Sequence, residues 1–148
     1  MAETLGTLCD KLTIVKLKQY HTEDKIRLLS LEQQCNQLTD EIEEFISDAL
    51  SGLIPLKKLT FKSNKVFKQE GNEIKIIRGS IGNIFCTLAE VNCSLWHEQE
   101  KVYDFENVPI LQKDIVVKQL AILNLERTKC IDEIDNNLIE LLHNKKIK

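Results

Sequence analysis

Apolar residues recur every three or four positions over most of the chain, which is the spacing of one face of an α-helix. The first two runs consist of Leu5, Leu8, Leu12 and Val15, and then of Leu31, Cys35, Leu38, Ile42 and Phe45. The spacing resumes after Ser80, a residue suited to cap a helix, and again beyond Pro109. We therefore predict long helices over residues 4–21, 26–50, 81–104 and 112–143.

The period changes between the second and third helices. Gly52 and Pro55 in "SGLIP" end the second helix, since both residues interrupt regular structure. Two short apolar runs follow on either side of Gly71 and Asn72, which together suit a tight turn. The pattern predicts a β-hairpin within residues 58–78. The expected fold is a mainly α, four-helix bundle with this hairpin inserted, in a single domain over residues 1–148.

Composition and charge narrow the function classes. The 148 residues are 43% hydrophobic and carry a net charge of −3, which gives no electrostatic reason to bind nucleic acid or an anionic membrane. The opening "MAETLGTLCDKL" does not read as a signal peptide, and the chain has no apolar run of membrane-spanning length. We expect a cytoplasmic protein without membrane insertion.

Metal and cofactor motifs are missing from the sequence. The five cysteines show no C-x-x-C pair, and they are expected to be reduced and buried. Glu140-x-x-His143 stands alone, whereas a di-iron bundle needs two such motifs and two further glutamates. The chain also lacks a Gly-rich phosphate loop and a nucleophile elbow. No metal and no cofactor are therefore expected.

Residues 6–25 resemble residues 82–101, so the first and third helices can be read as two copies of one unit. The identical pairs are Gly6/Gly82, Leu12/Leu88, Val15/Val91, His21/His97 and Lys25/Lys101. Tyr20 in "QYHTED" corresponds to Trp96 in "LWHEQE". For Trp96, packing in the core is favoured over stacking on a ligand.

Polar residues interrupt the apolar faces of three predicted helices. Asn92 and Gln99 do so on the third helix, and the corresponding positions of the first hold Lys16 and Glu23. On the last helix Asn124 and Arg127 interrupt the inward stripe of Val117, Leu120 and Ile131. Burying such groups without partners costs about 1–3 kcal/mol for an amide and more for a charge, so they should meet one another or a ligand. We predict a cluster of Lys16, Asn92 and Arg127 with Glu23 or Glu90, either as a structural network or as a ligand pocket.

Several segments resemble a family of small bacterial proteins known only as a domain of unknown function. The resemblance rests on "AETLGTLCDKLTIVKLK", "LTFKSNKVFKQEGNE", "SIGNIFCTLAEVNCSLWHEQEKVYDFE" and "VVKQLAILNLERTKCIDEID". Related helical proteins tend to occur among genes for surface-polysaccharide assembly, which implies a setting but no activity. The motif positions that the resemblance implies are Asp10, Lys11, Lys16, Glu90, Asn92, Trp96, Glu98, Asn124 and Arg127.

Two function classes stay open at this point. The first is a helical accessory or binding protein that holds an anionic sugar intermediate or a partner enzyme in a surface-glycan pathway. The second is a small non-metal enzyme on phosphorylated or nucleotide sugars, with Glu23 or Glu90 as acid or base and Lys16 with Arg127 as an anion clamp. The lysines of residues 57–78 protect an exposed strand edge or contact an anion. Broad apolar faces, which include Leu17, Phe85, Ala89 and Trp96, predict a homodimer.

Overall fold

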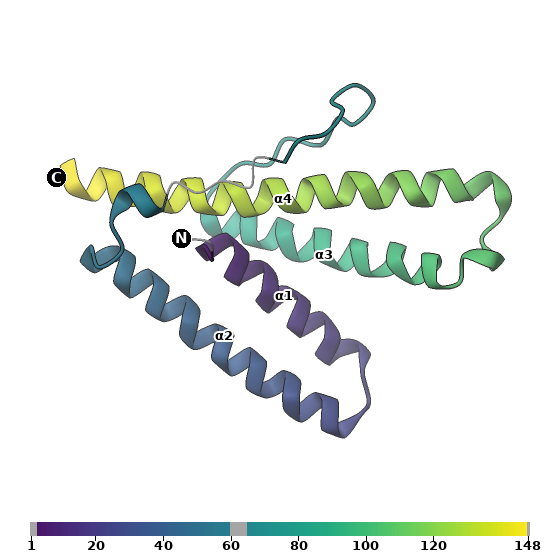
Figure 1. Ribbon diagram of the computed structural model, residues 1–148, viewed down its shortest axis with the longest axis horizontal. Coiled ribbons are helices and arrows are strands. Elements are labelled where there is room, and N and C mark those ends of the chain that lie inside the picture. Colours follow the sequence, from purple (N-terminus) through teal and green to yellow (C-terminus); the bar gives the residue numbers. More distant parts are fainter. Residues whose placement is uncertain (1–2, 60–64, 148) are drawn as a thin grey trace.

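The computed structural model describes residues 3–59 and 65–147, which form four long α-helices packed together (Figure 1). The helices are α1 (Leu5–His21), α2 (Lys25–Ser51), α3 (Ile81–Tyr103) and α4 (Ile110–Ile147). Short 3-10 turns, η1 (Leu56–Lys58) and η2 (Phe105–Asn107), follow α2 and α3. The four predicted helices are confirmed, and α4 is longer at both ends than the apolar pattern indicated.

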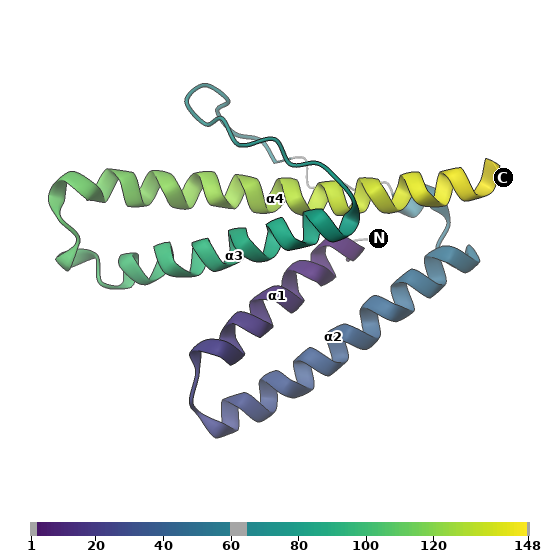
Figure 2. The same ribbon diagram turned by 180° about the vertical axis from the view of Figure 1, so that it is seen from behind.

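The helices form two antiparallel pairs that cross obliquely. Figures 1 and 2 show α1 beside α2 and α3 beside α4, with the α1–α2 pair inclined to the other. α1 lies between α2 and the α3–α4 pair and contacts α2, α3 and α4. The amino-terminal half of α4 extends past the α1–α2 pair, where α3 lies beside it. Residues of α1 are therefore placed to join the two pairs.

Local capping sets the helix boundaries. The Thr4 hydroxyl accepts from the Thr7 backbone N–H at 3.2 Å, and the Thr7 hydroxyl accepts from the Thr4 N–H at 2.8 Å. Asp24 caps α2 by accepting from the backbone N–H groups of Ile26 and Arg27. α2 ends at Gly52, whose φ of 81° is readily adopted only by a residue without a Cβ atom. The Thr4 and Asp24 caps pair backbone N–H groups that the helices leave without an acceptor, and at the other end of α2 the Gly52 N–H donates to the Ala49 carbonyl.

The hydrophobic core lies where both helix pairs and the 53–59 and 65–80 segments meet. Its largest fully buried side chains are Ile84, Leu88 and Ile134. The other described residues of this core are Leu5, Leu8, Cys9, Phe45, Ala49, Ile54, Leu59, Ile77, Cys130, Leu138 and Leu142. Because the core is concentrated at one end of α1, the opposite end of α1 is less completely enclosed.

The predicted β-strands are not seen in the described part of residues 58–78, and residues 60–64 of the predicted hairpin lie outside the described residues. The predicted turn does form: the Asn72 N–H donates to the Gln69 carbonyl at 3.0 Å, and Gly71 has a φ of 78°. Asn72 accepts a hydrogen bond from Lys118 of α4, and Lys75 lies 3.9 Å from Glu126. Side-chain contacts to α4 thus hold this segment in place of the expected strand ladder.

Neither a membrane span nor a disulfide occurs among the described residues. No described helix combines the length and apolar character needed to cross a bilayer. All five cysteines are free thiols, of which Cys9 and Cys130 are buried and Cys86 is exposed. The prediction that the cysteines are buried is therefore wrong for Cys86, and Cys35 and Cys93 are only half-buried.

Candidate functional site

A buried carboxylate, Asp10 of α1, connects three helices. Its Oδ1 accepts from Asn92 Nδ2 of α3 at 2.9 Å and from Arg127 Nε of α4 at 2.9 Å. Its Oδ2 accepts from Arg127 Nη2 at 2.5 Å. Asn92 also donates to the Thr13 hydroxyl at 2.7 Å, and that hydroxyl donates to the Asp10 carbonyl. We call Asp10, Thr13, Asn92 and Arg127 the polar cluster.

Charge pairing and burial act in opposite directions on the pKa of Arg127 in the polar cluster. The Asp10 side chain is 6% exposed and the Arg127 side chain is 34% exposed. The hydrogen bonds to Asp10 raise the pKa of Arg127, although partial burial opposes the shift. A two-point contact between guanidinium and carboxylate also fixes the relative orientation of the two side chains. Because Asp10 has partners on both oxygens, the polar cluster is suited to hold helix register.

A second buried carboxylate joins α1 to α4. The Gly6 backbone N–H donates to Asp135 Oδ1 at 2.8 Å. Burial raises the pKa of the Asp135 carboxyl, and the hydrogen bonds from Gly6 and the Thr4 side chain partly oppose this shift. Burial, followed by the nearby charges of Asp135 and Asp10, raises the pKa of the Cys9 thiol to about 12. Cys9 is therefore a protonated core side chain rather than a nucleophile.

The structure brings together Asn92 and Arg127 but separates the other members of the predicted cluster. Asn92 is 3% exposed. Lys16, Glu23 and Glu90 are exposed, and no hydrogen bond or ion pair among the described residues joins them to the polar cluster. The carboxylate that pairs with Arg127 is Asp10, not Glu23 or Glu90. In the sequence, only the family resemblance singled out Asp10 as a motif position. The spacing of apolar residues does not indicate that this aspartate, next to Cys9, is buried.

The remaining predicted site residues are distributed along α3 and α4. Gln99 is exposed, and Asn124 donates to the Leu120 carbonyl at 3.0 Å within α4. Trp96 is half-buried, and its Nε1 donates to Glu100 Oε1 at 2.8 Å. Of these residues, Trp96 borders a cleft.

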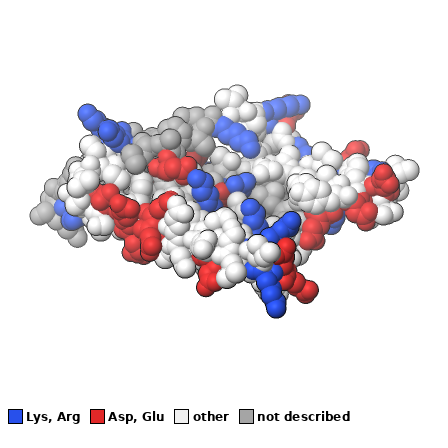
Figure 3. Space-filling view, turned by 60° about the horizontal axis from the view of Figure 1, so that its bottom comes forward, with Lys and Arg blue, Asp and Glu red and all other residues white. Residues whose placement is uncertain are grey.

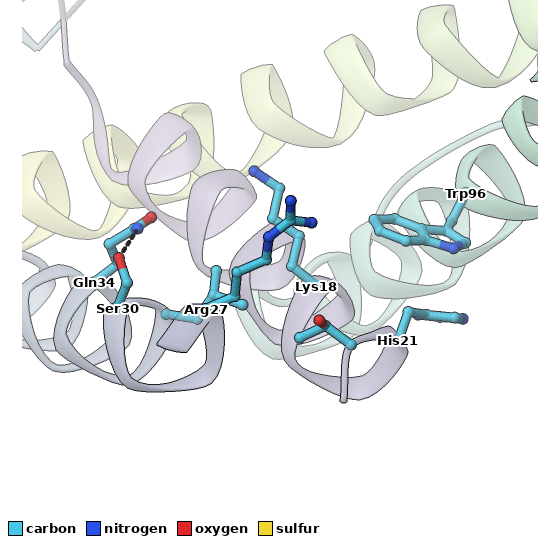
Figure 4. Close-up of a pocket in the computed structure, with 8 residues that line it drawn as sticks. Lys18, His21, Arg27, Ser30, Gln34 and Trp96 are labelled. Carbon is cyan, nitrogen blue, oxygen red and sulfur yellow. Dashed lines mark hydrogen bonds between the residues drawn. The ribbon is translucent and has the colours of Figure 1, made fainter. Parts of the chain in front are cut away.

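The cleft lies between α1, the start of α2 and the middle of α3. Its volume is about 500 Å³, and its lining residues are Lys18, His21, Thr22, Arg27, Ser30, Leu31, Gln34 and Trp96. Figure 4 shows the Lys18 and Arg27 side chains between the Ser30–Gln34 pair and the rings of His21 and Trp96. We call this the α1–α2 cleft.

The aromatic wall of the α1–α2 cleft is formed by both copies of the sequence repeat. The His21 and Trp96 rings are stacked, with centroids 4.6 Å apart and planes inclined by 23°. His21 Nδ1 is hydrogen-bonded to the Leu17 carbonyl oxygen at 2.8 Å, and it is the donor because a carbonyl oxygen only accepts. The ring centroids of His97 and His21 are 6.0 Å apart. The corresponding aromatic-histidine pairs of the repeat, one on α1 and one on α3, therefore lie next to each other.

The α1–α2 cleft is positively charged. Lys18 and Arg27 line it, and no carboxylate does so among the described residues. The nearest charge partner of Arg27 is Asp24, at 3.7 Å, where both side chains are largely exposed to water. In the face of the molecule shown in Figure 3, basic side chains form a group near the middle, with acidic groups to either side. Charge is therefore grouped locally, although the whole chain is slightly acidic.

Sequence reasoning missed Lys18, Arg27, Ser30 and Gln34 as lining residues of this cleft. Each stands on a polar helix face, where a solvent-exposed role is the usual interpretation. The sequence feature most closely related to the cleft was the repeat, in which His21 corresponds to His97 and Tyr20 to Trp96. The two helix pairs cross obliquely, and that angle, which leaves the cleft open, has no local sequence pattern.

The polar and aromatic groups that line the α1–α2 cleft are therefore cations, amides, hydroxyls and rings. No group of three or more histidine, cysteine or acidic residues among the described residues is arranged to hold a metal ion. Comparison of the chain with models of known protein families, with curated proteins and with solved structures gives no match. The geometry of this chain is thus the basis for its functional interpretation.

Proposed function

We propose that this protein binds a small anionic molecule, of the class of phosphorylated sugars, in the α1–α2 cleft. The observation that carries the proposal is that Lys18 and Arg27 both line a cleft whose described lining has no carboxylate. Because both cations line the same cleft, an anion bound there can interact favourably with each of them. The fit to this class, rather than to any anion, depends on the other lining groups.

The position of Arg27 strengthens the argument for an anion. Arg27 lies in the first turn of α2, where the helix dipole is positive and a cation is disfavoured. Lys25, the first residue of α2, adds a second cation at the same end. An anion beside this turn would interact favourably with both the side chains and the dipole.

The remaining lining suits a hydroxylated molecule. Ser30, Gln34 and Thr22 supply hydroxyl and amide groups that can exchange hydrogen bonds with sugar hydroxyls. The stacked His21 and Trp96 provide an apolar wall against which a sugar ring can pack. A volume of about 500 Å³ is within the usual range of small-molecule sites, about 300–1,000 Å³.

The proposal makes the protein a binding or accessory component rather than a catalyst. Holding an anionic sugar intermediate for a partner enzyme agrees with the surface-glycan setting that the family resemblance implies. The enzymatic alternative used Arg127 as part of an anion clamp, but Arg127 is paired with Asp10. It also used Glu23 or Glu90, both of which are exposed. No observed geometry favours that alternative.

A melting-temperature panel tests the proposal. Glucose 1-phosphate should raise the melting temperature of the parent protein in a saturable way, since a ligand that binds only the folded state stabilises it. Glucose at the same concentration should have little effect, because it lacks the anion. Inorganic phosphate should act more weakly than glucose 1-phosphate, because it cannot use the aromatic wall.

Paired variants locate the effect. Lys18→Gln combined with Arg27→Gln should abolish the stabilisation by glucose 1-phosphate. Lys129→Gln is the matched control, because Lys129 is an exposed cation that pairs with Glu133 on α4. Equal stabilisation of all three proteins would place the anion outside the α1–α2 cleft, and the absence of any stabilisation of the parent by either phosphate would refute the proposal.

A further inference from the structure

A second groove runs along the opposite side of α1. Lys16 and Lys18 are two residues apart, so at about 100° per residue they project from opposite sides of the helix. The groove on the Lys16 side has two connected parts, which share Lys16 and Cys35 as lining residues. We call these parts the apolar half and the polar half of the Lys16 groove.

The apolar half is formed by α1, α2 and α3. It has a volume of about 520 Å³, and its main apolar contributions come from Leu12, Leu17, Phe85 and Ala89. Its remaining lining residues are Thr13, Lys16, Tyr20, Cys35 and Thr39. Tyr20 is 86% exposed, although burying the apolar face of a tyrosine ring is favourable. A hydrocarbon chain laid in this half would cover these side chains.

The polar half begins at Lys16 and carries more cations than anions. Lys16 and Lys25 line it together with a single described carboxylate, Glu32. Leu28 and Leu29 add apolar surface beside these charges. Neither lysine takes part in an ion pair with another described residue. Gln19, also in this half, has a buried side-chain oxygen without a hydrogen-bond partner in the described structure. A buried acceptor of this kind is costly unless a donor from elsewhere reaches it.

We infer that the Lys16 groove binds a single-chain anionic amphiphile. Its hydrocarbon chain lies between Leu17 and Phe85, and its anionic head contacts Lys16 and Lys25. A hydroxyl on the head or an accompanying water donates to the Gln19 oxygen. One groove thus joins an apolar part to a part that holds two lysines, and this points to one molecule with an apolar chain and an anionic head. The inference is independent of sugar-phosphate binding on the other side of α1.

Binding of monomeric dodecanoate, below its micelle concentration, tests the inference by titration calorimetry. The parent should bind dodecanoate saturably at one site, and acetate, which has the head without the chain, should not bind measurably. Lys16→Gln should weaken dodecanoate binding about tenfold, equivalent to about 1.4 kcal/mol. Ala89→Trp should abolish it by filling the apolar half, and Ala89 is exposed enough that the change leaves the core intact.

Two controls separate binding in the Lys16 groove from binding elsewhere on the molecule. Lys129→Gln, which changes an exposed cation of α4 outside the groove lining, should bind dodecanoate as the parent does. Circular dichroism of Ala89→Trp verifies that it is folded. Unchanged binding in both Lys16→Gln and Ala89→Trp would overturn the inference. So would binding of phosphatidylglycerol vesicles without binding of monomeric dodecanoate, or loss of a parent dimer in Ala89→Trp without any dodecanoate binding by the parent, since these outcomes would assign the groove to a membrane surface or to a second copy of the chain.

Discussion

Asp10 is the side chain on which the joining of α1, α3 and α4 depends most directly. The Asp10 side chain is 6% exposed, and its carboxylate accepts three hydrogen bonds from Asn92 and Arg127. A buried ion pair adds little net stability when compared with an apolar replacement, but removing one partner strands the other charge. The polar cluster should therefore respond asymmetrically to mutation.

Arg127→Leu should lower the free energy of unfolding by about 3 kcal/mol, because it leaves the Asp10 carboxylate buried with only Asn92 as a donor. Urea denaturation measures the loss. The double variant Asp10→Asn with Arg127→Leu should recover part of it, since the stranded charge is then absent. If the losses of Asp10→Asn alone and Arg127→Leu alone simply add in the double variant, the two side chains are not energetically coupled.

Asp135 should give stability a measurable pH dependence. Burial raises the pKa of its carboxyl in the folded protein. The folded state therefore holds this proton more tightly than the unfolded chain does. The contribution of Asp135 to stability is fully present below the ordinary aspartate pKa of about 3.9 and is lost as the pH rises through the folded value.

Asp135→Asn removes that titration while keeping an oxygen that can accept from the Gly6 N–H. The stability of the variant minus that of the parent should consequently increase from pH 4 to pH 7, as measured by urea unfolding. The exposed Asp114→Asn serves as the control and should show no such trend. A difference for Asp135→Asn that decreases with pH would contradict the assigned direction of the pKa shift.

At the scale of elements, the contact between α1 and α4 requires a glycine. A Cβ atom on Gly6 would collide with the Ile131 carbonyl oxygen and would lie 3.1 Å from Asp135 Oδ1. The carbonyl belongs to the backbone of α4, so it cannot move aside as a flexible side chain can. α1 and α4 therefore approach as closely as their backbones allow.

Gly6→Ala should destabilise the protein by about 2 kcal/mol, because α1 must shift away from α4 and weaken the packing between them. Gly82→Ala is a matched control at the corresponding position of the sequence repeat. A Cβ atom there would meet only the Ser80 hydroxyl oxygen, at 4.0 Å, so stability should be unchanged or slightly higher. Thermal unfolding compares the variants, and equal losses from both would show that the close approach at Gly6 is unimportant.

Apolar periodicity predicted the helices but not their contacts. Helix formation is signalled locally, by spacing and by caps such as Asp24 and Ser80. On α4 the inward stripe was assigned partly wrongly: Val117 is 55% exposed, whereas Val116 and Leu123 are buried. The amino-terminal half of α4, which includes Val117, extends past the α1–α2 pair (Figures 1 and 2). Fewer helices are therefore available there to cover its apolar side chains.

The candidate site was predictable only where a residue's burial leaves a trace in the spacing. Asn92 and Arg127 interrupt apolar stripes, and the structure brings them together through Asp10. Lys18 and Arg27 leave no such trace, since an exposed cation that lines a cleft and one that faces open water look alike in a sequence. The crossing of the helix pairs distinguishes the two cases, and it results from contacts distant along the chain.

At the scale of the whole molecule, exposed apolar side chains gather around the connection between α3 and α4. Tyr103 is 84% exposed, Ile110 83%, Leu111 90% and Ile115 65%. The faces from which the sequence predicted a homodimer are arranged differently: Trp96 stacks on His21, while Phe85 and Ala89 line the Lys16 groove. The homodimer stays a prediction, with the α3–α4 end as its candidate contact.

Light scattering should give twice the chain mass of 17.1 kDa at micromolar concentration. Leu111→Lys with Ile115→Lys should return the mass to that of one chain by placing charges in the contact. Leu53→Lys, which alters an exposed leucine on another part of the molecule, should leave the dimer intact. A parent mass of one chain would reject the homodimer.

The central claim is that the α1–α2 cleft binds a small anionic molecule, and Trp96 offers a direct reading of it. Trp96 is the single tryptophan of the chain and lines the cleft, so its fluorescence reports on that site without a label. Titration with glucose 1-phosphate at pH 8 and low salt should change this fluorescence saturably, and Lys18→Gln combined with Arg27→Gln should abolish the change. Added salt should weaken the binding by screening the cations. A fluorescence signal that stays constant in the parent, or one that saturates equally in the parent and the double variant, would contradict the claim.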